Sequence, residues 1–234
     1  MINVDNSPYF SIQSMPLFSR YLALGQLFSL SVALVFLSFS SSALAHPHSW
    51  ISTKTTVNVE GGYIQSLSMD WLFDPMTTAY TLSGSKLTPK NRQQVFQKLS
   101  KDIQENLLYK HYFTYFYQGD NPIRYQAVEG AKISMVGPKL RLQFQLQLAK
   151  PIDLHTPKLS LYIFDPTYYI DMSWDDYGTI GFNGDVGSCR LHTHAPNPTS
   201  EQVAYAMSLQ IDSDPDNELG KLFTQKATID CSGE

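Results

Sequence analysis

Apolar and polar positions alternate from Ser49 to Val59, where every odd position from Ile51 onward carries Ile, Val or Thr. The same period of two returns from Tyr63 to Phe73, after the turn signal Glu60-Gly61-Gly62. A period of two places successive side chains on opposite faces of a strand. Two such runs joined by a glycine-rich turn predict a β-hairpin over residues 49–73.

The pattern becomes helical after Asp74-Pro75. Asp is a common helix cap and Pro fits the first turn, so a short helix is predicted over Met76–Leu82. Thr88-Pro89 repeats this start signal. Through Lys90–Tyr109 an apolar residue follows every fourth position, at Val95, Leu99, Ile103 and Leu107. This predicts an amphipathic helix whose apolar stripe faces the core.

Strand patterns return in the second half of the chain, over Tyr112–Tyr117, Tyr125–Val136, Leu140–Leu148, Leu159–Phe164 and Tyr168–Trp174. The last two surround Asp165-Pro166-Thr167, and we interpret them as a strand–turn–strand unit. Thr199-Ser200-Glu201-Gln202 has the spacing of a capping box, which predicts a short helix to about Leu209. A final strand is predicted to end at Cys231.

The order of predicted elements is strands, helices, strands, helix, strand. Hairpins dominate and no βαβ alternation occurs, so we expect an antiparallel sheet. The predicted fold class is α+β: mainly antiparallel β, as a sandwich or a curled sheet. It carries a helical insertion around residues 75–110 and a short helix in the C-terminal half.

The first 45 residues have the features of a targeting segment. Arg20 precedes the apolar run Leu27–Leu37, and Ala43-Leu44-Ala45 has the small-x-small pattern that signal peptidase accepts. The run is about 11 residues long, shorter than the roughly 20 that span a bilayer. An uncleaved anchor starting near Tyr21 is the alternative, and a translation start at Met15 stays open. We expect residues 1–45 to be a signal peptide and residues 46–234 a single periplasmic domain.

Composition narrows the classes of function. A chain of 234 residues suits one globular domain, and its net charge of -4 comes without a basic stripe that would bind phosphates. We therefore expect no nucleic-acid partner. The chain also contains no HExxH motif, phosphate loop, dinucleotide fingerprint or hydrolase elbow. An enzyme is accordingly not expected.

The chain has two cysteines, Cys189 and Cys231. Export to an oxidising compartment favours a disulfide between them. The competing interpretation, a pair of thiolate metal ligands, has less support because no CxxC spacing is present.

Four of the six histidines form two H-x-H pairs, His46/His48 and His192/His194. In an extended chain, residues i and i+2 point to the same side, so each pair can present both rings to one metal ion. Together the pairs would supply four nitrogens in a roughly tetrahedral site for zinc. The alternatives are a flexible N-terminus for the first pair and exposed loop residues for the second.

Cleavage after Ala45 would make His46 the N-terminal residue and add its α-amine as a nitrogen donor. An amine and two imidazoles form a histidine brace suited to copper, whereas imidazoles alone fit zinc, nickel or cobalt. Pro47 lacks the amide that the common N-terminal copper motif deprotonates. Asp165 lies in a tight turn, where it either caps the backbone or contributes an oxygen ligand.

Four segments carry a family resemblance: AHPHSWI, the hairpin end WLFDP, the turn FDPTYY and the C-terminal LGKLFTQKATIDC. Over about residues 46–231 the chain resembles an uncharacterised bacterial family named for periplasmic components of ABC-type transport systems. That family is associated with nickel/cobalt/zinc-type membrane transporters. His46 and His48 occupy its HPH motif, and Asp74 and Asp165 match acidic positions in two other motifs.

The resemblance implies a periplasmic protein that binds a divalent metal ion, zinc in first place, and passes it to a membrane permease. The predicted metal ligands are His46, His48, His192, His194 and Asp165. A copper-binding histidine brace is the first alternative. The second is a metal-free accessory subunit that uses its aromatic runs to bind a membrane complex.

Overall fold

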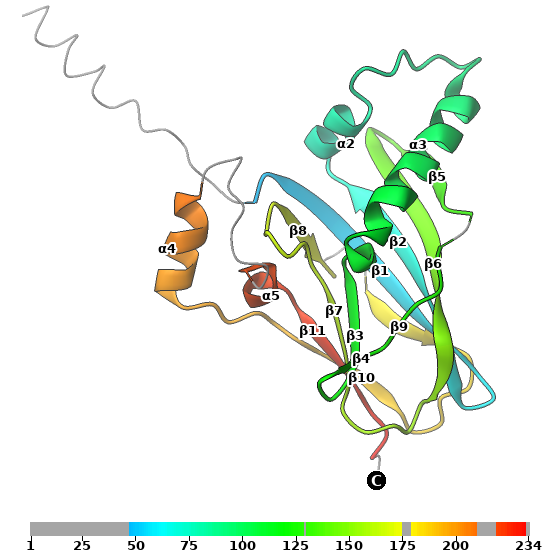
Figure 1. Ribbon diagram of the computed structural model, residues 1–234, viewed down its shortest axis with the longest axis vertical. Coiled ribbons are helices and arrows are strands. Elements are labelled where there is room, and N and C mark those ends of the chain that lie inside the picture. Colours follow the sequence, from blue (N-terminus) through cyan, green and yellow to red (C-terminus); the bar gives the residue numbers. More distant parts are fainter. Residues whose placement is uncertain (1–46, 129, 175–178, 210–218, 233–234) are drawn as a thin grey trace, which may run out of the picture. The chain divides into compact units, whose positions relative to one another are not determined.

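The computed structural model describes residues 47–128, 130–174, 179–209 and 219–232, whose strands form two sheets (Figure 1). The first sheet has the order β5-β6-β2-β1-β8, and β9 also pairs with β1. Its strands are β1 (Ser49–Glu60), β2 (Tyr63–Phe73), β5 (Lys132–Val136), β6 (Lys139–Asp153), β8 (Ile170–Ser173) and β9 (Ile180–Asn183). The second sheet has the order β10-β11-β7-β3-β4. Its strands are β3 (Thr114–Gln118), β4 (Asn121–Pro122), β7 (Leu159–Ile163), β10 (Arg190–His194) and β11 (Lys226–Asp230). The predicted α+β class with mainly antiparallel strands is confirmed.

The hairpin predicted over residues 49–73 is present as β1 and β2. Ile51 pairs with Phe73 at one end of the ladder and Glu60 with Tyr63 at the other. The odd positions of β1 are buried, as the alternation predicts. Gly61 and Gly62 both have positive φ, of 57° and 81°. A two-residue turn with positive φ at both positions matches the twist of the strands, and glycine adopts it without strain.

One hydrophobic core lies between the inner faces of the two sheets. The first sheet contributes Leu67, Met69, Leu142 and Leu146, among others. The second contributes Phe116, Leu161 and Ile163. Two sheets that share one core make a β-sandwich, the first of the two predicted arrangements.

The helical insertion consists of α2 (Pro75–Thr81) and α3 (Arg92–Leu108), followed by the 3-10 turn η1 (His111–Phe113). Both α-helices start and end within two residues of the predicted limits. The apolar stripe of α3 packs on the core through Leu99, Ile103 and Leu107, as predicted.

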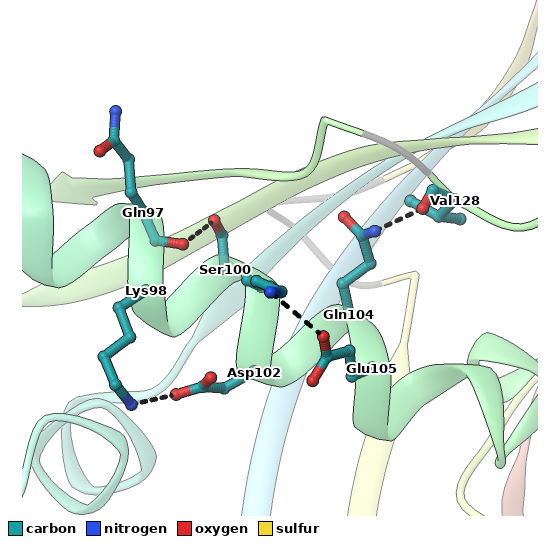
Figure 2. A network of polar contacts seen from close by, with 8 residues as sticks. Gln97, Lys98, Ser100, Asp102, Gln104, Glu105 and Val128 are labelled. Carbon is teal, nitrogen blue, oxygen red and sulfur yellow. Dashed lines mark hydrogen bonds and ion pairs between the residues drawn. The ribbon is translucent and has the colours of Figure 1, made fainter.

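The outer face of α3 carries polar contacts (Figure 2). Lys98 and Asp102 form an i,i+4 ion pair at 2.7 Å, and Lys101 lies 3.8 Å from Glu105. Exposed pairs of this kind stabilise a helix by only a few tenths of a kcal/mol. Gln104 is more consequential, because its amide donates to the Val128 carbonyl and accepts from an amide N–H of the same segment. It thereby fastens the chain leading to β5 onto the helix.

The capping box predicted at Thr199 is present. The Thr199 hydroxyl accepts from the Gln202 amide at 3.2 Å, and the Gln202 side chain accepts from the Thr199 amide at 2.8 Å. Helix α4 (Ser200–Ser208) follows it. Helix α5 (Leu219–Phe223) was not predicted, because five residues are too few to show a helical period.

Three details of the predicted strands differ from the structure. The Leu159–Phe164 and Tyr168–Trp174 segments do not form a hairpin, because β7 lies in the second sheet and β8 in the first. Strand β8 runs parallel to β1, as does β9, so the first sheet is not purely antiparallel. The predicted strand over Tyr125–Val136 is reduced to β5 and one isolated bridge between Tyr125 and Leu148. Alternation reveals that a segment is a strand, but not which strand it pairs with.

The segment predicted to be a signal peptide lies outside the described residues. Among the residues that are described, no helix is both long and apolar enough to cross a membrane.

Candidate functional site

His48 is held in place immediately before β1. Its backbone N–H donates to the Tyr169 carbonyl at 3.0 Å. Its ring is partly buried, with its centroid 5.1 Å from that of the Tyr169 ring and a tilt of 38°. His48 is therefore anchored to the chain just before β8, and the alternative of a flexible tail does not apply to it. His46 lies outside the described residues.

Asp165 organises the loop that carries Tyr169. The residue is 5% exposed, and its carboxylate accepts hydrogen bonds from the Thr167 hydroxyl and amide. It also accepts from the amides of Tyr169 and Ile170 at 3.1 and 3.2 Å. These contacts correspond to the backbone-capping role that we considered for it. The loop in turn sets the position of the carbonyl that binds His48. Its assignment as a metal ligand stays a prediction.

Asp74 links the end of the β1–β2 hairpin to the same place. Its carboxylate caps α2 by accepting from the amides of Met76 and Thr77 at 2.7 and 3.1 Å. It also accepts from the Trp50 amide at 3.1 Å. Next to it, the hydroxyls of Ser49 and Thr77 lie 2.7 Å apart. Partial burial raises the pKa of Asp74, but the hydrogen bonds from the Thr77 hydroxyl and from backbone amides outweigh it, so the pKa lies below its usual range.

Asp74→Ala should lower the free energy of unfolding by about 1–2 kcal/mol, because α2 loses its N-cap and the Trp50 amide loses a partner. Urea denaturation measures the change. Since the folded pKa is lowered, this contribution is complete above the unfolded value of about 4 and disappears as pH falls through the folded pKa. Asp74→Asn is the matched control, because Asn also caps helices. A loss as large in Asn as in Ala would contradict the capping role.

A fourth segment, α5, packs on the Asp165 loop. The Gly220 amide donates to the Pro166 carbonyl at 3.1 Å. The Phe223 ring stacks on Tyr168 with centroids 4.2 Å apart and an interplanar angle of 13°. Tyr168 has a positive φ of 57°, and burial together with the nearby Asp171 carboxylate raises its pKa to about 12. Four segments far apart in the sequence thus meet at the N-terminal end of β1.

The second histidine pair lies elsewhere. His192 and His194 are exposed on β10, at the edge of the second sheet, whereas His48 precedes β1 of the first. Nε2 of His194 lies 3.0 Å from the Thr228 hydroxyl. Within the described part of the chain, His48, His192 and His194 do not gather into a cluster with metal-ligand spacing. The role of His192 and His194 as metal ligands stays a prediction. The structure does not bring them to His48, so it does not support a shared site.

Cys189 and Cys231 form the predicted disulfide. A disulfide is typical of exported proteins. Its sulfurs and a ring nitrogen of His155 all lie within 4.8 Å of one another. The sequence offered no signal for His155, because it is isolated in the chain and only the fold brings it to the cysteines.

Tyr169, Thr77 and Gly220 were also missed as site residues. All three lie within or beside segments that carry the family resemblance. None of the three has a side chain that is a common metal ligand. Tyr169 contributes its backbone carbonyl, Thr77 its hydroxyl, and Gly220 close packing. A search for shared motifs, rather than for ligand types, would have found them.

Comparison with known proteins shows the family of the chain. Residues 31–231 match a family described as "Protein of unknown function (DUF1007)", and the match includes all four segments. An uncharacterized protein of Haemophilus influenzae is 32% identical over 200 residues, which cover 84% of this chain and 95% of the relative. The chain belongs to the DUF1007 family.

Proposed function

We propose that this is a periplasmic protein that binds a divalent metal ion, zinc in first place, and serves a membrane metal transporter. His46 and His48 are the proposed ligands. The observation that carries the proposal is the anchoring of His48 by Tyr169, at the point where the four shared segments meet. A histidine held in place loses little conformational entropy when it binds a metal ion.

The surroundings of His48 suit a cation. Trp50 is the Cα partner of Asp171 on the parallel ladder between β1 and β8, so their side chains lie on the same face of the sheet. His48 and Tyr169 lie just before the starts of β1 and β8, with ring centroids 5.1 Å apart, and so are close to that face. Trp50 is exposed and its neighbour Ser49 is buried, so this face is the outer one. A carboxylate there adds negative charge beside the proposed histidine ligands.

Exposed apolar side chains near the site support a protein partner. On α2, Met76 is 70% exposed and Tyr80 is 79% exposed, one helical turn apart. Trp50, which donates its amide to the helix cap Asp74, is 47% exposed. Aromatic residues and Met are enriched at protein interfaces. We propose that this surface contacts the transporter.

Zinc titration of the mature protein, with His46 at the N-terminus, tests the proposal by calorimetry. The double variant His46→Ala/His48→Ala should bind zinc at least about 100-fold more weakly, because both imidazoles are lost. His155→Ala in the disulfide form is the matched control and should bind like wild type. Unchanged affinity in the double variant would overturn the site. His192→Ala/His194→Ala decides separately whether the second pair contributes.

The zinc affinity should also fall below about pH 6, because protonated imidazoles do not bind metal. With two histidine ligands the decrease approaches about 100-fold per pH unit once both are protonated in the free protein.

One residue added ahead of His46 distinguishes copper binding from zinc binding. It removes a histidine brace, which needs the free amine, but leaves two imidazoles for zinc. Absence of metal from the protein taken from the periplasm, with co-purification of a membrane protein, would instead favour a metal-free accessory subunit.

A further inference from the structure

A second group of potential ligands lies around the disulfide. One ring nitrogen of His155 and the two sulfurs of Cys189 and Cys231 are all within 4.8 Å of one another. Among the described residues, this is the one group of three His, Cys, Asp or Glu side chains with such spacing. Asp153 stands beside it, with a carboxylate oxygen 3.4 Å from Nδ1 of His155. The same oxygen accepts the His155 backbone N–H at 2.9 Å.

The backbone holds these residues together independently of the S–S bond. Cys189 directly precedes β10 and Cys231 directly follows β11, and the ladder between these strands extends to the pair Arg190–Asp230. Sγ of Cys231 lies 3.3 Å from the Leu154 carbonyl oxygen. In the reduced protein a Cys231 thiol at this position has an acceptor for its S–H. The strands therefore keep the cysteines near His155 when the disulfide is open.

We propose that reduction of the Cys189–Cys231 disulfide opens a zinc site formed by both thiolates and His155. A dithiol supplies two electrons and two protons: its own sulfurs become a disulfide, and the two cysteines become thiols. Cys231 is partly exposed and Cys189 is buried, so the reductant attacks the sulfur of Cys231. Zinc then displaces the two thiol protons. In the disulfide form the sulfurs are bonded to each other and the site is closed.

The chemistry of the group fits zinc. Thiolate and imidazole are its preferred ligands, and tetrahedral coordination at Zn–S distances of about 2.3 Å puts two sulfurs about 3.8 Å apart. The two sulfurs and the ring nitrogen already lie within 4.8 Å of one another. Side-chain rotation therefore suffices to bring them to these distances, without movement of the strands. Nδ1 of His155 faces Asp153, which leaves Nε2 for the metal. Zinc-bound histidines commonly have such a carboxylate partner, which fixes the ring orientation. A water molecule completes the fourth position.

This site is separate from the His48 site. The Leu154 amide donates to the Gly62 carbonyl at 2.9 Å, so the cluster lies at the β1–β2 turn. His48 precedes the other end of β1, a strand of 12 residues. The two sites are about 35 Å apart along the strand. Substitutions at one site leave the other intact, and the two proposals can fail independently.

Cobalt(II) titration of the mature protein under anaerobic conditions tests the proposal, with and without a phosphine reductant. Only thiolate ligation produces a sulfur-to-cobalt charge-transfer band, so cobalt bound at the His48 site does not contribute. We expect this band to saturate at one equivalent in the reduced protein, to be absent in the disulfide form, and to disappear when zinc is added. His155→Ala should weaken the reduced site at least about tenfold, and Asp153→Asn about tenfold.

Near-UV circular dichroism reports folding throughout. If the reduced chain is unfolded, recovery of its native spectrum with one equivalent of zinc supports the site, because binding is then coupled to folding. Failure to bind cobalt through thiolates, whether folded or not, overturns the proposal. So does thiolate binding that is as tight in His155→Ala as in wild type. His111→Ala is the control for loss of an unrelated histidine and should bind like wild type.

Discussion

Replacing both Cys189 and Cys231 by alanine is expected to lower the free energy of unfolding by about 4 kcal/mol. The two residues are 42 positions apart. In the chain-entropy model, a cross-link that closes a loop of this length removes about 4 kcal/mol of conformational freedom from the unfolded chain. For a domain of this size, the melting temperature should fall by about 8–16 °C.

The fold explains why the cross-link matters at this position. β10 is the edge strand of the second sheet and pairs with β11. A long connection that contains α4 and α5 joins the two strands. This long connection is the loop that the cross-link closes, so removing the disulfide acts mainly by freeing the unfolded chain. The disulfide closes the end of this ladder beyond Arg190 and Asp230.

Urea denaturation of the double variant and of wild type, each with and without reductant, measures the effect. Reduced wild type should approach the stability of the variant, and reductant should leave the variant unchanged. A wild-type protein that loses no stability on reduction would contradict the prediction. All comparisons are made without zinc, because metal bound to the reduced cysteines would restore part of the stability.

Gly220→Ala is expected to destabilise the protein by about 3 kcal/mol. A Cβ at this position would lie 1.8 Å from the Asp165 carbonyl oxygen and 2.9 Å from its carbonyl carbon. Both contacts are with backbone, so no side chain can rotate away to relieve them. Either α5 must move outward, or the loop that carries Tyr169 must shift.

This substitution should also act on the proposed metal site. Because the Tyr169 carbonyl and ring hold His48, a displaced loop weakens zinc binding without removal of any ligand. Gly181→Ala is the matched control, since a Cβ there has no atom within 4 Å. It should change stability by less than about 1 kcal/mol. Wild-type stability in Gly220→Ala would show that α5 does not pack on the loop as described.

The sequence by itself determined the local elements. Strict alternation and Gly61-Gly62 predicted the β1–β2 hairpin, and capping residues predicted α2 and α4. The period of four in α3 predicted both the helix and its buried face. Each of these features is set by residues that are close together in the chain. Their backbone geometry and the period of their side chains determine the local structure. The disulfide also followed from the sequence, because the chain has only two cysteines and its N-terminal segment predicts export.

Only the tertiary structure decided which strands pair and which residues meet. The alternation of β7 and β8 does not reveal that they belong to different sheets, because a period of two is the same whatever the partner strand. The contacts of His48 with Tyr169 depend on that crossover, as does the approach of Gly220 to Asp165. His155 reaches the cysteines only because the β10–β11 ladder ends beside the β1–β2 turn. The packing of the whole core determines which residues distant in the sequence come into contact. A local sequence pattern does not contain this information.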